Sequence, residues 1–154
     1  MSPMHPDYLI RDGSLEEIAS VERTIPEFPR PKSADQLAAR LGVPGALLKV
    51  ACADGRPVAY KAGYPLPDGW FYSWTGAVQP AHRRRGLALA LLQEQERLVR
   101  EAGYAGIRVK SRNGFPSMLQ LLIGQGYRIV DLEPVPSAAD PKIHFAKPFP
   151  PSTP

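Results

Sequence analysis

The segment from Tyr72 to Ala88, YSWTGAVQPAHRRRGLA, constrains the fold of this chain more than any other. Its first part, up to Val78, reads as a strand, and three arginines with Gly86 follow as a basic turn. From Leu87 onward, apolar residues recur at helical spacing, and Gly103 supplies a left-handed stop. The segment therefore predicts a strand, a basic turn and the start of an amphipathic helix.

A turn of this kind in front of a helix can bind anions. The first N–H groups of a helix have no partner within the helix, and the helix dipole places roughly half a positive charge there. Gly86 has no side chain that would keep a ligand away from the backbone. A diphosphate group suits this end of the helix. The alternative is a solvated surface turn with no ligand.

The pattern Arg83-x-x-Gly86-x-Ala88 follows a strand that ends in Ala77-Val78. It resembles the motif with which the GCN5-related N-acetyltransferases (GNAT family) hold the pyrophosphate of an acyl-CoA. The resemblance implies an acyl-CoA N-acyltransferase fold, acetyl-CoA as the cosubstrate and a primary amine as the acceptor. Direct attack by the amine in a ternary complex is the reaction it implies.

The first half of the chain predicts two capped helices and an antiparallel meander. A strand at 8–10 precedes a capping box at Ser14, which opens a helix that Pro26 ends. A stiff, proline-rich loop leads to a second short helix from Ser33 to Gly42. Three antiparallel strands are expected at 48–53, 58–64 and 70–78, with Asp54-Gly55 as the hairpin turn between the first two.

The second half alternates in type, with helices at 87–102 and 116–124 and strands at 105–110 and 127–132. Such alternation predicts parallel pairing. A last strand at 143–146 is a possible sheet edge, and a homodimer through it is plausible. We therefore expect an α/β (α+β) fold with a mixed, partly antiparallel central sheet of six or seven strands and four helices.

The order from Ile107–Lys110 through Asn113 to Gly126-Tyr127 continues the resemblance over most of the chain. The length of 154 residues suits one domain. We place an acetyltransferase domain at 1–147 and a disordered, proline-rich tail at 148–154.

Composition excludes several other classes of protein. No apolar stretch approaches the roughly 18 residues of a membrane span, and the start of the chain lacks the pattern of a signal peptide. The single Cys52 fits a reducing compartment, so a cytoplasmic location is the default. The net charge of +4 arises from 19 basic and 15 acidic residues spread along the chain, which argues against a nucleic-acid partner. The three histidines fit no common zinc spacing, and we expect no metal.

The resemblance also implies how the cosubstrate binds. Two neighbouring parallel strands, here 70–78 and 107–110, would splay apart to admit the pantetheine arm. The pyrophosphate would lie on backbone N–H groups while the side chain of Arg83 braces the turn, and residues of the first strand would pair with the pantetheine amides. Asn113 would contact the same arm, or it is a plain turn or helix-cap residue. The implied pyrophosphate residues are Arg84, Arg85, Gly86, Leu87 and Ala88, and the implied strand residues are Gly76, Ala77 and Val78.

The acceptor amine must lose a proton before it attacks. A lysine-type amine has a pKa near 10.4, so holding it neutral at pH 7 costs roughly 4.6 kcal/mol. Many family members carry a tyrosine acid four residues before the Gly-aromatic pair, where this chain has Leu122. The candidate catalytic residues are Glu27, in the loop between the first two helices, and Tyr72. Water activated by the backbone and Tyr72 or Ser73 is a third possibility.

Glu27 and Tyr72 can each also have a role outside catalysis. Tyr72 is expected on the same strand face as Trp74 and Gly76, pointing into the substrate cleft or into the core. Glu27 can equally be an exposed loop carboxylate. With Glu27, Tyr72 and Trp74 around it, the cleft would suit a cationic amine, carried either by a small molecule or by a protein or peptide. A non-catalytic acyl-CoA-binding module is the main alternative function, and a basic nucleic-acid-binding domain ranks third.

Overall fold

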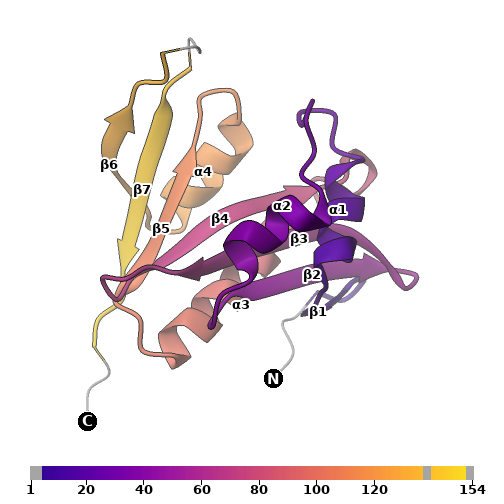
Figure 1. Cartoon of the computed structure of the whole chain (residues 1–154), viewed down its shortest axis with the longest axis horizontal. Helices are drawn as coiled ribbons and strands as arrows, with labels where there is room; N and C mark the ends of the chain where they lie inside the picture. The colour runs from indigo at the N-terminus through magenta and orange to yellow at the C-terminus, as the bar shows by residue number, and fades with distance from the viewer. Residues whose placement is uncertain (1–4, 137–139, 152–154) are drawn as a thin grey trace.

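The computed structural model describes residues 5–136 and 140–151. One mixed sheet of seven strands runs through the molecule in the order β1-β2-β3-β4-β5-β7-β6, with four α-helices around it (Figure 1). The strands are β1 Leu9–Asp12, β2 Leu47–Ala53, β3 Arg56–Pro65, β4 Phe71–Val78, β5 Gly106–Ser111, β6 Arg128–Glu133 and β7 Lys142–Pro148. The helices are α1 Leu15–Glu22, α2 Ala34–Leu41, α3 Leu87–Glu101 and α4 Pro116–Gly124. The expected fold class is confirmed.

The N-terminal half follows the sequence closely. Strands β1 to β4 form an antiparallel meander, and Asp54 and Gly55 take the positive φ values of 51° and 78° that a tight hairpin turn requires. Both α1 and α2 begin with a complete capping box, at Ser14 and Ser33. α1 ends at Glu22, earlier than the expected stop at Pro26.

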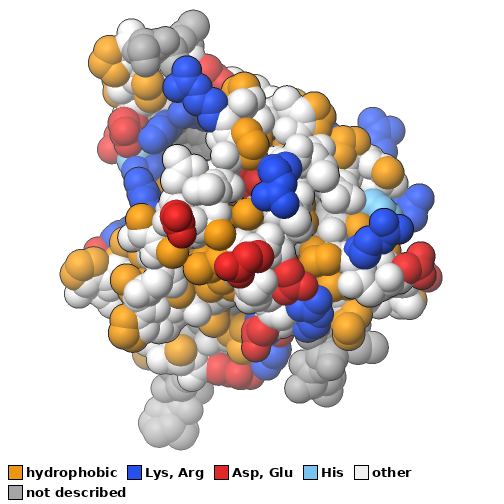
Figure 2. Space-filling model, turned by 45° about the vertical axis from the view of Figure 1, so that its right-hand side comes forward, with side chains coloured by type: hydrophobic (Ala, Val, Ile, Leu, Met, Phe, Trp, Pro, Cys, Tyr) orange, Lys and Arg blue, Asp and Glu red, His pale blue; other side chains and the backbone are white. Residues whose placement is uncertain are grey.

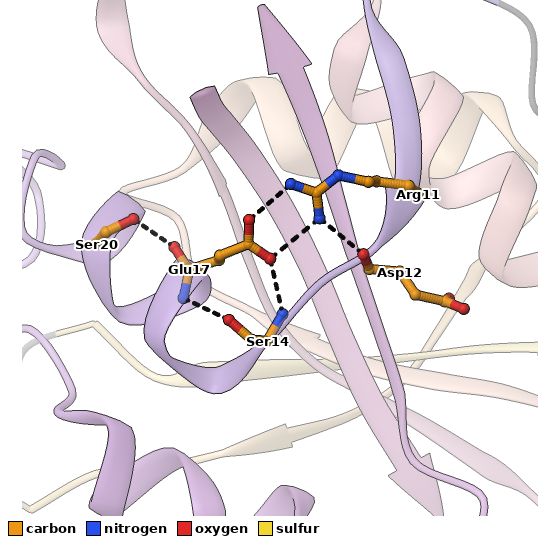
Figure 3. Close-up of polar contacts among 5 residues, drawn as sticks. All are labelled: Arg11, Asp12, Ser14, Glu17 and Ser20. Atoms are coloured by element: carbon orange, nitrogen blue, oxygen red, sulfur yellow. Dashed lines mark hydrogen bonds and ion pairs between the residues drawn. The ribbon is translucent and has the colours of Figure 1, made fainter. Parts of the chain in front are cut away.

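α1 is tied to the sheet at its first turn (Figure 3). Arg11 on β1 donates to both carboxylate oxygens of Glu17, at 3.0 and 2.6 Å. The same carboxylate accepts the backbone N–H of Ser14, whose hydroxyl in turn accepts the N–H of Glu17. The capping box and the ion pair therefore share one side chain, and they fix the helix whose end leads into the loop at Glu27.

The expected parallel pairing of the second half is wrong beyond β4 and β5. β7 lies between β5 and β6 and runs antiparallel to both. β5 and β6 point the same way, as the alternation of helix and strand requires, but the alternation could not show that a later strand returns between them. Strand 143–146, a possible edge in the sequence, is therefore interior, and the edges of the sheet are β1 and β6.

The ordered chain extends further than the expected boundary at 147. Pro148 pairs with Gly106, and Phe149 is buried and donates its N–H to the carbonyl of Ala105 at 2.8 Å. The last three residues of the expected tail lie outside the described residues.

Helices cover the two faces of the sheet unequally. α1 and α2 pack on one face of β2 to β4, over a core that includes Val50, Tyr60 and Ala62. α3 and α4 pack on the other face, against Phe71, Ile107 and other core residues. On the α1 side, β5, β7 and β6 carry no helix (Figure 1). This uncovered region lies beside the segment in which the sequence places the site. None of the described helices is long and apolar enough to cross a membrane.

Candidate active site

β4 and β5 part in the middle of the sheet. Their parallel ladder consists of Phe71↔Ile107, Tyr72↔Arg108 and Ser73↔Val109, and it ends there. β4 stays paired with β3 as far as Val78, so its other edge, over residues 74–78, is left without a partner strand. Backbone N–H and C=O groups along such an edge can pair with an extended ligand. This is the splay that the family resemblance implies for strands 70–78 and 107–110.

A β-bulge lies where the two strands part. Between the pairs Ala62↔Thr75 and Tyr64↔Tyr72, β4 advances three residues while β3 advances two. The extra residue reverses the alternation of side chains along β4. Tyr72 and Trp74 both meet the ring of Tyr64, with centroids 5.5 and 6.3 Å away.

The bulge corrects one expectation from the sequence. Gly76 does not share a face with Tyr72 and Trp74, because a side chain at Gly76 would meet Lys61 at 3.5 Å. Lys61 lies on the opposite face of the sheet, within the influence of Glu96 on α3. Gly76 therefore faces α3, and the two aromatic residues face the α1 side.

Within 5–136 and 140–151, the turn between β4 and α3 leaves backbone N–H groups at the helix start without a partner. A short 3₁₀ turn at Pro80–His82 is followed by Arg84 at φ 62° and Gly86 at φ 79°. Left-handed backbone is unusual for arginine and costs of order 1 kcal/mol, so its presence suggests a functional constraint. Among the described residues, no side chain caps α3, and a Cβ at Gly86 would have nothing within 4 Å. The turn is thus open to a ligand.

Arg83 connects this turn to the loop between α1 and α2. Its Nε donates to the carbonyl of Val78 at 3.0 Å, and its two terminal nitrogens donate to the two oxygens of Glu27, each at 2.9 Å. The hydrogen bonds from Arg83 lower the pKa of Glu27. Arg83 braces the turn, as the resemblance implies. Glu27 has both oxygens engaged by Arg83, which leaves it poorly placed to accept a proton.

Tyr72 lies in a cleft and not in the core. It is half-buried, and with Tyr64 it lines a groove of about 490 Å³ on the uncovered face of the sheet. Burial raises the pKa of the Tyr72 phenol. The phenol is therefore protonated at neutral pH, and it can donate a hydrogen bond to a group in the groove.

Asn113 occupies a turn before α4, whose N-cap is Phe115. Asp140 accepts the backbone N–H groups of Asn113 and Gly114, at 3.2 and 3.0 Å. Asn113 is exposed and does not cap the helix. Leu122, at the position of the tyrosine that many family members carry, is fully buried between α4 and the sheet.

The structure contains a buried polar network next to β4 that we did not predict from the sequence. The carboxylate of Glu22 is 1% exposed and accepts from the Tyr60 hydroxyl and from the backbone and side-chain nitrogens of Lys32. Tyr60 also shares a hydrogen bond of 2.7 Å with Thr75 on the unpaired part of β4. The burial of Glu22 could have been predicted from spacing, because Glu22 lies four residues after Ile18 and therefore on the buried face of α1.

Together, the parted strands and the open turn form an α/β site suited to an extended ligand that ends in an anionic group. The model of the Acetyltransferase (GNAT) family matches residues 14–115 of the sequence. The match spans most of the chain and includes both β4 and the basic turn. The chain therefore belongs to this family and is an acyltransferase.

Solved structures agree on the fold. The ribosomal-protein-S18-alanine N-acetyltransferase from Escherichia coli superposes with a TM-score of 0.82 at 18% identity, over 95% of this chain and 96% of that one. NAA60 from Arabidopsis thaliana, in complex with a bisubstrate analogue, gives 0.76 at 15% identity, over 94% and 99%. A putative streptothricin acetyltransferase from Bacillus anthracis, in complex with acetyl coenzyme A, gives 0.66 at 13% identity, over 73% and 68%. A search of the curated proteins found no match.

Proposed function

We propose that this protein transfers the acetyl group of acetyl-CoA to a primary amine by direct attack in a ternary complex. One observation carries the proposal: the unpaired edge of β4, over 74–78, runs directly into the open turn at the start of α3. An edge with free amides suits an arm that contains peptide-like amides, and a helix start with free N–H groups suits a diphosphate. Acetyl-CoA combines both in one molecule, and the solved complex of the B. anthracis neighbour contains it.

The residues present fit this group. Gly86 leaves open space at the turn, and Arg83 holds the turn to β4 through the carbonyl of Val78. We assign the pyrophosphate to the backbone N–H groups of residues 84–88 and the pantetheine amides to residues 76–78. Asn113, exposed in the turn before α4, is assigned to the same arm. Acetyl-CoA supplies an activated acyl carbon, to which the amine nitrogen bonds as the carbon–sulfur bond breaks.

The chain's own residues must orient the amine and let its proton leave. We propose that Tyr72 orients the amine, because its ring lines the groove beside the parted strands. Because Arg83 engages both oxygens of Glu27, we propose that water in the groove accepts the proton of the amine and that Glu27 positions the turn. Leu122 lies at the position of the family's tyrosine acid and has no proton to give to the leaving thiol. The thiol that leaves has a pKa near 8.5, so it can depart as a thiolate without a dedicated acid.

Thermal unfolding with acetyl-CoA tests the binding step. At about 100 times its dissociation constant, the ligand adds roughly 2.7 kcal/mol, which raises the unfolding temperature by several degrees. Gly86→Glu should abolish the shift through its side chain and charge. Gly55→Glu is the matched control, because Gly55 has the same left-handed backbone and open surroundings but lies in the β2–β3 turn. No shift in the unaltered protein would contradict the proposal.

Release of free CoA in the presence of amines tests the transfer step. The main alternative, a module that binds acyl-CoA without turnover, is favoured by the apolar Leu122 and by the engagement of Glu27 with Arg83. That alternative predicts the thermal shift without release of CoA. Release that depends on the amine would instead support the enzyme.

A further inference from the structure

The uncovered face of the sheet holds a groove between β4, β5, β7 and β6, with α2 at its rim. Side chains on this face alternate with the core residues of β5, so that Arg108 and Lys110 point out where Ile107 and Val109 point in. Figure 2 shows basic side chains gathered around a hollow at the upper left of the molecule. The groove opens beside Tyr72, where β4 and β5 part.

Three cations and one carboxylate line the groove, and two of the cations already have partners. Arg108 donates to Asp68 at 2.6 Å. Lys110 lies 3.6 Å from Glu133, which also accepts from His144 at 2.8 Å. Asp131, the lining carboxylate, is exposed and accepts the N–H of Leu132.

Arg40 is the remaining cation. Within 5–136 and 140–151, no carboxylate lies within ion-pair distance of it, and its one hydrogen bond runs from Nη1 to the Tyr64 hydroxyl at 3.2 Å. Its guanidinium lies 5.1 Å from the centre of the Trp74 ring. An arginine has five N–H donors in a fixed fork, which matches the two oxygens of a carboxylate. Arg40 therefore presents unused, oriented donors in a groove walled by aromatic rings.

Arg40 lies close to the place where the amine must react. Trp74, beneath its guanidinium, is the first β4 residue beyond the ladder with β5. Tyr64 connects Arg40 to Tyr72, because its hydroxyl accepts from Arg40 while its ring packs against that of Tyr72. A carboxylate bound by Arg40 would thus lie on the same side of the sheet as Tyr72 and Trp74, beside the point where the strands part.

We propose that the acceptor is a small amino carboxylate, such as a free amino acid, whose carboxylate Arg40 binds while its amine enters the gap between β4 and β5. This inference rests on the proposed acetyl transfer. It narrows the cationic amine expected from the sequence to one that also carries a carboxylate, because Arg83 neutralises Glu27 and Arg40 has no carboxylate partner among the described residues. A peptide N-terminus has an amide in place of the nearby carboxylate, and Arg40 would discriminate against it.

Steady-state release of CoA, with acetyl-CoA saturating, tests the inference on matched acceptors. The panel pairs free L-amino acids with their carboxamides and with dipeptides that begin with the same residue. We expect kcat/KM to be at least tenfold higher for the free acids. Arg40→Gln should raise KM for the acids ten- to a hundredfold and change kcat/KM for the carboxamides less than threefold. Arg40→Lys, which keeps the charge but not the fork, should fall between the two.

Controls separate the possible failures. Arg56→Gln removes an exposed cation at the β2–β3 turn and should leave both classes of acceptor unchanged. Carboxamides or dipeptides that react as well as the free acids would overturn the inference, as would an Arg40→Gln effect of equal size on acids and amides. The proposed transfer itself fails only if no amine in the panel releases CoA, or if acetyl-CoA gives no thermal shift.

Discussion

Arg83 grips Glu27 with both terminal nitrogens at 2.9 Å while its Nε holds the carbonyl of Val78. One side chain thus joins the end of β4, the turn before α3 and the loop between the first two helices. The side chains of this ion pair are 38% and 41% exposed, so its contribution to stability is small, about 1 kcal/mol or less. The main role of this ion pair is therefore to fix the geometry of the site.

Glu27→Gln distinguishes a positioning carboxylate from a catalytic base. Without the negative charge, Arg83 holds the loop less firmly, and we expect KM for acetyl-CoA or for the acceptor to rise several-fold while kcat stays within about threefold. Initial rates over a range of pH measure both parameters. A fall in kcat of a hundredfold or more, with loss of the acidic limb of the pH profile, would identify Glu27 as the base.

Tyr60→Phe should destabilise the protein through the buried network. It removes the hydroxyl that donates to Glu22 and bonds to Thr75, and buried partners left unsatisfied cost about 1–3 kcal/mol in unfolding free energy. Urea unfolding at pH 7 measures the change. Tyr64→Phe is the control, because its hydroxyl bonds to exposed Arg40 and its loss should cost less than about 1 kcal/mol. Equal losses in the two variants would contradict this account of the network.

Glu17 should make the protein sensitive to acid. The hydrogen bonds from Arg11 lower the pKa of the Glu17 carboxyl to about 2 in the folded protein. Since this folded value lies below the unfolded one, near 4.3, the stabilisation is complete above the unfolded pKa and is lost as pH falls toward 2. Unfolding free energies of the protein and of Glu17→Gln should therefore converge between pH 5 and pH 2. Glu101→Gln, at an exposed ion pair, should leave the acid profile unchanged.

Lys61 should have the opposite dependence on pH. Burial lowers the pKa of its ammonium group to about 8, below the value near 10.4 in the unfolded chain. The unfolded state binds more protons between these values, so the stability due to Lys61 rises as pH increases from 8 to 10. Lys61→Met should remove that rise and stabilise the protein at pH 7 by roughly 2–3 kcal/mol. An unchanged pH profile in the variant would show that the ammonium is solvated.

Some elements of the fold could be predicted from the sequence, and others could not. Local signals placed the two capping boxes, the Asp54-Gly55 hairpin and the left-handed Gly103, because each depends on a few adjacent residues. The position of β7 between β5 and β6 depends on pairing between strands far apart in the chain, which no local pattern encodes. The bulge in β4 is likewise a matter of register with β3, and it moved Gly76 to the face opposite Tyr72.

The same limit applies to the candidate site. The turn from Arg83 to Ala88 could be placed because its residues are contiguous and its glycine is distinctive. The charge of the cleft could not be predicted, because Arg83 and Glu27 lie 56 residues apart and their pairing neutralises the carboxylate expected there. Arg40 escaped notice for the same reason: its neighbours in the groove come from β3 and β4, beyond the reach of spacing within α2.

The place of β7 has a consequence for how the protein emerges from the ribosome. Strands β1 to β4 pair with neighbours in sequence, and α3 follows them at once, so the half with the basic turn can assemble while synthesis continues. β5 and β6 must wait for residues 142–148, which supply the partner strand that each lacks. The wall of the groove that carries Lys110 and His144 is thus completed late, and until then the nascent chain exposes two unpaired strand edges that a chaperone or another chain can bind.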